Sequence, residues 1–244
     1  MGEVTNLEAM IAAEHFRDKD ELAAVLKRVE NGELLAYIIG EWFFYRHYFK
    51  INRDCLIPRP DTECLVEVAL SKLKSGERFA DLCTGSGCIG LTILDERPDC
   101  PVGLLVDIQD GALDAARENA AALSLTGRAS FAHADLLCDD PLGDERFGLI
   151  ISNPPYIPSD DIAAYPSLSA EPRIALDGGG DGLCFYRRFL SAFAKNLNDG
   201  GGFVFEIGFD QGDAIRALAE EHGFSAEITK DLSGNDRVAY LTKH

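Results

Sequence analysis

The sequence predicts an α/β protein with a doubly wound, mostly parallel sheet of seven strands. From Phe79 onward, short apolar segments alternate with amphipathic helical patterns, which is typical of a parallel sheet covered on both faces. With 244 residues and 46% hydrophobic content, the chain is long enough to bury one sizeable core. The longest apolar segments have only the length of strands, so no segment is expected to cross a membrane.

The elements of this sheet follow in chain order. Strands are expected at 79–83, 101–106, 129–134, 147–152, 202–207, 225–229 and 236–242. Helices are expected at about 86–95, 110–124, 182–197 and 210–222. The last two strands follow the final helix without another helix between them, which predicts an antiparallel hairpin at the edge of the sheet.

The pattern changes before Phe79. Residues 6–30 indicate one or two amphipathic helices, and the aromatic-rich segment 42–49 indicates a hairpin whose rings pack on the domain. Stacking of nucleobases on these rings is the alternative interpretation. We therefore expect three parts: a short helical segment at 1–35, a β-hairpin and linker at 36–63, and the sheet domain at 64–244.

The composition excludes some classes of protein. The formal charge of −18, from 23 basic and 41 acidic residues, argues against binding to duplex DNA, which depends on clustered Lys and Arg. Seven cysteines form no CxxC pair and have no histidine at ligand spacing, so no metal site is expected. The N-terminus is acidic and lacks the basic start of a signal peptide, so we expect a cytoplasmic protein.

The most informative segment is Asn153-Pro154-Pro155-Tyr156, which we call the proline corner and which directly follows the apolar strand 147–152. The two prolines remove two N–H donors and cannot continue a helix or a strand. The chain must therefore leave the strand abruptly, with carbonyl oxygens directed into the space beyond. Acceptors without competing donors suit a substrate amine or amide.

A glycine-containing turn between the first strand of the sheet and the next helix predicts a cofactor site, because it lets the backbone approach a ligand closely. The residues expected to contact the cofactor there are Asp81, Cys83, Thr84, Gly85, Ser86 and Gly87. Asp107, which ends the second strand, can accept both hydroxyls of a ribose. Asp135 and Leu136, after the third strand, can recognise an adenine amino group and pack its ring. Asn153 is expected at the same crevice.

Two alternatives stay open for this crevice. Asp107 and Asp135 can each be explained as a helix cap or a turn former. Gly85, Gly87 and Gly90 complete a GxGxxG pattern, so a nicotinamide-dependent dehydrogenase is possible. Against the dehydrogenase, no acid–base group for hydride transfer is indicated, whereas the proline corner lies where a methyl acceptor would be held.

The proline corner, the Gly85-Ser86-Gly87 turn and Asp107 together resemble the class I S-adenosylmethionine-dependent methyltransferases, which have a Rossmann-like fold and modify planar amide or amine nitrogens. More narrowly, the chain is similar to the HemK family of protein-(glutamine-N5) methyltransferases, which act on the Gly-Gly-Gln glutamine of peptide chain release factors. The narrower resemblance rests on the segments IPRPDTE at 57–63, EPRIALDGG at 171–179, EIGFDQG at 206–212 and DLSGNDR at 231–237.

Two departures accompany this resemblance. Cys83 stands where the release-factor enzymes usually have glycine, and the run from Cys83 to Cys88 is also similar to the sister enzymes that methylate ribosomal protein L3. Family members also usually carry a longer N-terminal substrate-binding domain than the 35 residues that precede Ala36. Release factor and ribosomal protein L3 therefore both stay open as protein substrates, with the segments around Arg59, Gln211 and Arg237 favouring the release factor.

The resemblance implies that S-adenosylmethionine is the cofactor and that the proline corner is the catalytic and substrate-binding element. The Asn153 side-chain oxygen and the Pro154 carbonyl would each accept one N–H of the glutamine carboxamide, which orients the nitrogen and stabilises developing positive charge. Pro155 would lock the turn, and Tyr156 would form part of an apolar wall beside the substrate.

Other roles and functions are weighed beside these. Arg59 either reaches over the active site to contact the substrate or forms an ion pair with Glu63. Glu206 either contributes to the crevice or caps the following helix. The rival functions are adenine-N6 methylation of nucleic acid and an inactive cofactor-binding partner of another methyltransferase.

Overall fold

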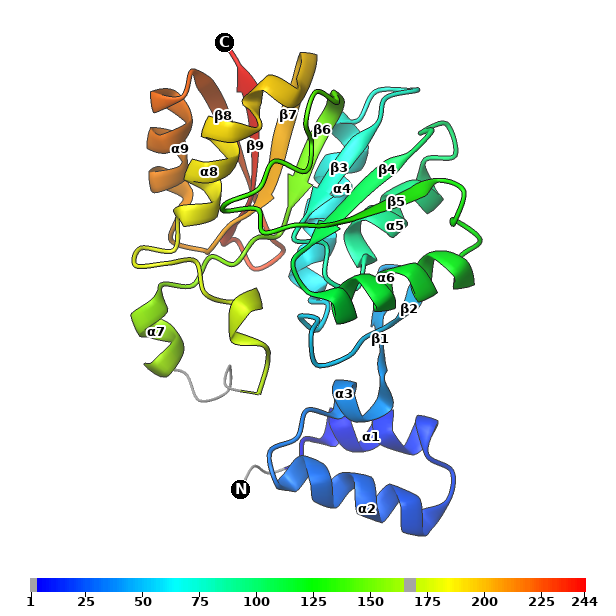
Figure 1. The fold of residues 1–244 in the computed structure, drawn as a ribbon. Coiled ribbons are helices and arrows are strands. Elements are labelled where there is room, and N and C mark those ends of the chain that lie inside the picture. The colour runs from blue at the N-terminus through cyan, green and yellow to red at the C-terminus, as the bar shows by residue number, and fades with distance from the viewer. Residues whose placement is uncertain (1–3, 165–169) are drawn as a thin grey trace.

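The computed structural model describes residues 4–164 and 170–244 (Figure 1). One sheet has the strand order β5-β4-β3-β6-β7-β9-β8. Its strands are β3 (Phe79–Leu82), β4 (Gly103–Asp107), β5 (Ala129–His133), β6 (Phe147–Ser152), β7 (Leu197–Glu206), β8 (Phe224–Lys230) and β9 (Asp236–Lys243). Strands β5, β4, β3, β6 and β7 pair in parallel in this order, whereas β9 is antiparallel to β7 and β8 is antiparallel to β9. The predicted seven-stranded, mostly parallel sheet with an antiparallel edge is confirmed.

Helices cover both faces of this sheet (Figure 1). One face carries α4 (Glu63–Lys72), α5 (Cys88–Glu96) and α6 (Asp110–Ala122), and the other carries α8 (Cys184–Ala192) and α9 (Gly212–Glu221). Successive side chains of a strand point to opposite faces, so Ile150 of β6 lies in the core under α8 and its neighbour Ile151 lies in the core under α4 and α5. Strands buried on both faces explain the continuous apolar segments of the sequence.

Helix α4 is absent from the elements expected from the sequence. It follows a short 3₁₀ turn, Pro60–Thr62, and buries Leu65, Val66 and Ala69 against the sheet. Proline at the start of the turn and apolar residues on one face are helix signals, which the irregular, proline-rich segment before them obscures.

The N-terminal part contains two helices, α1 (Asn6–His15) and α2 (Lys19–Glu30), then α3 (Leu35–Ile39) and the hairpin β1 (Glu41–Phe44) and β2 (His47–Lys50). Asp18 caps α2 through the main-chain N–H groups of Asp20 and Glu21, which explains why the helical segment breaks in two. Phe44 and Phe49 are buried in the core shared with α4, as the packing interpretation of the aromatic segment predicts.

The strand order reverses between β3 and β6, because β4 and β5 lie on one side of β3 and the later strands on the other. In open α/β sheets the crevice at such a reversal, outside the carboxyl ends of the strands, is where ligands bind. The glycine turn leaves the carboxyl end of β3, and the proline corner leaves the carboxyl end of β6. No helix within the described ranges combines the length and apolar character needed to span a membrane.

Candidate active site

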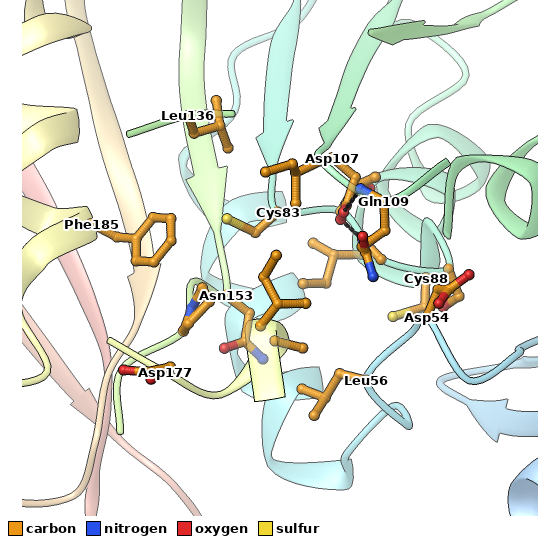
Figure 2. A pocket seen from close by; sticks show the side chains of 18 of the residues that line it. Asp54, Leu56, Cys83, Cys88, Asp107, Gln109, Leu136, Asn153, Asp177 and Phe185 are labelled. Atoms are coloured by element: carbon orange, nitrogen blue, oxygen red, sulfur yellow. Dashed lines mark hydrogen bonds between the residues drawn. The ribbon is translucent and has the colours of Figure 1, made fainter. Parts of the chain in front are cut away.

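A cavity of about 540 Å³ opens at the reversal point and is called the main cavity below (Figure 2). It joins segments that are far apart in the sequence. The lining residues are Asp54, Leu56, Pro58, Arg59, Thr62, Cys83, Thr84, Gly85, Ser86, Cys88, Ile89, Asp107, Ile108, Gln109, Ala134, Asp135, Leu136, Leu137, Asn153, Pro155, Arg173, Ile174, Ala175, Asp177 and Phe185. Most residues predicted from the sequence for the cofactor site are among them, whereas Asp81 and Gly87 are not.

Asp81 supports the glycine turn from the protein interior. Its side chain is fully buried, and its Oδ2 atom accepts hydrogen bonds from the Thr84 hydroxyl at 2.5 Å and the Gly90 N–H at 3.0 Å. Burial raises the pKa of Asp81 to about 7. A Cβ atom on Gly90 would lie 2.9 Å from the Asp81 carboxylate, so the third glycine of the GxGxxG pattern is explained by close packing inside the protein.

The turn itself has a strained backbone. Cys83, Gly85 and Gly87 all have positive φ angles, of 60°, 56° and 79°. Only glycine adopts such angles without cost, so the strain of this turn lies at Cys83, the one residue of the three with a side chain. A Cβ atom on Gly87 would approach Leu91 and Ala116, so Gly87 permits the helix to pack against the turn while its neighbours face the cavity.

Asp107 ends β4 and fixes two loops at once. Its Oδ2 atom accepts the Gly85 N–H at 2.8 Å and its Oδ1 atom accepts the Gln109 N–H at 3.0 Å. Burial raises its pKa, and these main-chain donors oppose that rise. Each carboxylate oxygen has two lone pairs and accepts one of these N–H groups, so Asp107, which lines the main cavity, can accept further hydrogen bonds from ligand hydroxyls without releasing the loops. The interpretation of Asp107 as a helix cap is wrong, because α6 has no side-chain cap and Gln109 is its N-cap residue, whereas the turn-forming role is present in the bond to the Gln109 N–H.

Asp135 and Leu136 line the cavity beside the Asp107 site. Leu136 is buried, and Asp135 is half-buried with its Oδ1 atom accepting the Leu137 N–H at 3.0 Å. The Phe185 ring of α8 also lines this part of the cavity (Figure 2). A carboxylate acceptor beside two apolar side chains can bind a flat heterocycle that carries an amino group. The turn-forming role of Asp135 is also present in the structure, so the two interpretations are compatible.

The proline corner is held by contacts on both sides. Ser152, the last residue of β6, donates its hydroxyl to the Leu82 carbonyl at 2.6 Å. Asn153 donates its Nδ2–H to the Thr62 hydroxyl oxygen at 3.3 Å, and no described residue donates to its Oδ1 atom. The contact to Thr62 therefore orients the carboxamide with its oxygen available as an acceptor, and both Asn153 and Pro155 line the main cavity.

Pro154 and Tyr156 are placed differently from Asn153 and Pro155. Neither lines the main cavity, and Tyr156 lines a second cavity instead. The Tyr156 hydroxyl donates to Glu206 Oε1 at 3.2 Å, and burial raises the pKa of Tyr156. Glu206 is buried at the end of β7, and its Oε2 atom has no hydrogen-bond partner within the described part of the chain. The cap interpretation of Glu206 is wrong, because α9 begins at Gly212 with Gln211 as its N-cap residue.

Arg59 lines the main cavity and forms an ion pair with Glu171, whose side chain is 3% exposed. The second oxygen of Glu171 accepts the Ile57 N–H at 3.2 Å. Glu63 instead accepts the Tyr45 N–H, so of the two interpretations of Arg59 the ion pair with Glu63 is wrong. The contacts of Glu171 tie the segment before α4 to the segment 171–177 across the mouth of the cavity.

Some residues of this site escape prediction from the sequence. Thr62 is part of the IPRPDTE segment, but only the fold shows that its hydroxyl meets Asn153, 91 positions later. Gln109 and Phe185 come from segments without a chemical pattern of their own. The presence of Thr62 and Glu171 inside two of the segments that carry the family resemblance is the signal that points to them.

This arrangement combines a cavity at the reversal point of the sheet with an oriented carboxamide acceptor, and the fold and site define a methyltransferase. Residues 60–202 match the family model of the methyltransferase small domain. The structure is similar to the ribosomal protein L11 methylase of Lactobacillus delbrueckii, with TM-score 0.57, 21% identity, and 83% and 92% of the two chains covered. It is also similar to the catalytic domain of hMettl16, with TM-score 0.61, 16% identity, and 80% and 74% covered. These two likenesses show the fold.

Sequence relatives define the family more narrowly. The chain is 44% identical to the release factor glutamine methyltransferase of Neisseria gonorrhoeae, covering 85% of this chain and 76% of the relative. It is 42% identical to the enzyme of the same name from Caulobacter vibrioides, covering 90% and 76%. The chain belongs to the release factor glutamine methyltransferase family. This membership confirms the resemblance found in the sequence, and it is incompatible with the nicotinamide-dependent dehydrogenase.

Proposed function

We propose that this enzyme methylates the side-chain nitrogen of the Gly-Gly-Gln glutamine in peptide chain release factors, with S-adenosylmethionine as the methyl donor. The observation that carries the proposal is the orientation of Asn153, whose Nδ2–H is bound by Thr62 while its Oδ1 atom is free to accept. A glutamine carboxamide presents two N–H groups: we assign one to the Asn153 oxygen, and the other to the main-chain carbonyl of Pro154, the next residue of the corner. The proposed substrate implies a cytoplasmic enzyme.

The residues of the main cavity fit S-adenosylmethionine. Asp107 has lone pairs for the ribose hydroxyls, and Asp135 with Leu136 and Phe185 suits the adenine ring. The cavity volume of about 540 Å³ lies within the range of about 300 to 1,000 Å³ that is usual for ligand sites. When bound, S-adenosylmethionine supplies a methyl group on a positively charged sulfur.

The protein's own contribution to the reaction is positioning and electrostatics. An amide nitrogen is a weak nucleophile because its lone pair is delocalised into the carbonyl group. Two fixed oxygen acceptors hold the nitrogen in one orientation and stabilise the positive charge that develops on it. This role requires neutral acceptors and no general base, in agreement with a corner made of an amide side chain and a main-chain carbonyl.

The acidic composition supports a protein substrate over a nucleic acid. Adenine-N6 methylation also transfers a methyl group to a weakly nucleophilic nitrogen, but the enzyme must then bind the phosphates of the duplex with basic side chains and flip the base out. A chain with formal charge −18 is poorly suited to that task.

The test is mass spectrometry of a purified release factor after incubation with the enzyme and S-adenosylmethionine. We expect a gain equal to one methylene group on the peptide that contains Gly-Gly-Gln, and no gain when that glutamine is replaced by glutamate. Methylation of ribosomal protein L3 alone would assign the enzyme to the sister branch. An unmodified release factor together with methylated nucleic acid would refute a protein substrate.

A further inference from the structure

A second cavity of about 650 Å³ adjoins the proline corner and is called the outer cavity below. Tyr156, Ile157 and Pro158 line it, directly after Asn153 and Pro155 of the main cavity. Only Pro154 and Pro155 therefore separate the acceptor of the main cavity, Asn153, from the wall of the outer cavity, which begins at Tyr156. None of the roles assigned so far uses the outer cavity.

The wall of the outer cavity is firmly built. Gln211 is 8% exposed, and its Nε2 group donates hydrogen bonds to the Tyr156 carbonyl at 3.0 Å and the Gly182 carbonyl at 3.3 Å. Its Oε1 atom accepts the Gly208 N–H at 2.9 Å. Gln211 thus joins the proline corner to the loop between β7 and α9, and all its polar atoms are used. A wall fixed in this way can hold a ligand at a constant position relative to Asn153.

The rim of the outer cavity has side chains that lack partners. Phe209 is 67% exposed, and the carboxylates of Asp161 and Asp210 are exposed without an ion pair to any described residue. The other charged groups are already paired: Asp181 with Arg187 at 2.5 Å, and Arg237 with Asp231 at 3.1 Å. The charge that the rim offers to a ligand is therefore negative, beside one exposed aromatic ring.

We propose that the outer cavity binds the polypeptide segment adjacent to the target glutamine, and that this segment has a basic side chain that pairs with Asp161 or Asp210. The inference rests on the proposed function and deepens it by stating what the enzyme recognises beyond the glutamine. The ring of Phe209 supplies apolar contact for the same segment.

The length of the corner limits which substrate residues reach the outer cavity. From Asn153 to Tyr156 the chain spans at most about 11 Å, because each residue extends at most about 3.6 Å. A substrate in extended conformation advances by a similar amount per residue. The first substrate residue to reach the outer cavity is therefore expected within roughly three positions of the glutamine.

The experiment uses the full-length enzyme, a purified release factor and S-adenosylmethionine, and measures kcat and KM by tritium transfer. For Phe209→Ala, we expect KM for the release factor to rise roughly tenfold, because apolar contact area is lost. For the double variant Asp161→Asn/Asp210→Asn, we expect a rise on the order of fivefold and a weaker dependence of kcat/KM on salt than in the wild type. Both variants should keep the wild-type kcat and the wild-type Kd for S-adenosylmethionine.

The matched control is Asp144→Asn/Asp199→Asn, which removes the same charge from exposed positions at the opposite edge of the sheet, near the starts of β6 and β7. We expect it to leave KM and salt dependence unchanged. An equal rise in KM in the control would show that only net charge matters and would overturn the proposal. Wild-type kinetics in both outer-cavity variants, or a loss confined to kcat, would also overturn it while leaving the proposed function intact. A wild-type enzyme that methylates no release factor would instead refute the proposed function itself.

Discussion

Replacing Thr62 with valine tests how the acceptor of the active site is oriented. Thr62 is 3% exposed, and its hydroxyl oxygen is the only described partner of the Asn153 Nδ2–H, at 3.3 Å. Valine has nearly the same shape, so the change removes a hydrogen bond without creating a large cavity. The bond is long and Asn153 is half-buried, so we take its net value as about 1 kcal/mol. If that energy orients the amide in the transition state, kcat falls roughly fivefold.

The assay is single-turnover methyl transfer to a release factor, with the Kd for S-adenosylmethionine and the melting temperature measured in parallel. Thr62→Ser keeps the hydroxyl and is expected to restore most of the rate, whereas Thr62→Val is expected to lose rate without losing cofactor affinity. A wild-type rate in Thr62→Val would refute the orienting role. Equal losses in the serine and valine variants would show that the methyl group of Thr62 matters for packing and that its hydroxyl does not.

Two further predictions concern the cofactor side of the cavity. For Asp107→Ala, the Kd for S-adenosylmethionine in calorimetry is expected to rise roughly 100-fold, since charge-assisted bonds to two hydroxyls and the support of two loops are lost; an unchanged Kd would contradict the ribose site. Burial raises the pKa of Asp81 from 3.8 in the unfolded chain to about 7 in the folded protein. The folded protein therefore binds the proton more tightly, and its free energy of unfolding should fall by at most about 4 kcal/mol as the pH rises from 3.8 to about 7. Asp81→Asn keeps the oxygen that binds Thr84 and Gly90 but cannot ionise, so in denaturant titrations at about pH 5 and about pH 8 its stability should fall less than that of the wild type. Equal falls would contradict the assignment.

The sheet could be predicted because its signals are local. Strands buried on both faces, such as β6, appear in the sequence as continuous apolar segments, and the turns that end them contain glycine or proline. Helix α4 does not stand out in the sequence because it directly follows the proline-rich segment 56–62, where prolines favour an extended chain and a short 3₁₀ turn before the helix begins at Glu63. Its burial against the sheet, rather than its local pattern, decides its structure.

The residues of the site that lie at the carboxyl ends of the strands could be predicted from the sequence. Asp107, Asp135 and Asn153 all follow parallel strands, so their convergence at one edge of the sheet follows from topology alone. The partners of these residues depend on side-chain contacts between distant segments. The choice of Glu171 over Glu63 as the partner of Arg59 illustrates this, because residues 171–177 fold back over the main cavity and bring Glu171 to the arginine.

The central claim is that the Asn153 oxygen, together with the Pro154 carbonyl, holds the glutamine nitrogen for methyl transfer. The most direct measurement is the single-turnover rate of methyl transfer to a release factor by Asn153→Ala and Asn153→Asp at saturating S-adenosylmethionine. We expect both rates to fall by about two orders of magnitude, because alanine lacks the acceptor and aspartate lacks the N–H that Thr62 holds in place. Rates close to wild type in both variants, with cofactor binding retained, would contradict the claim.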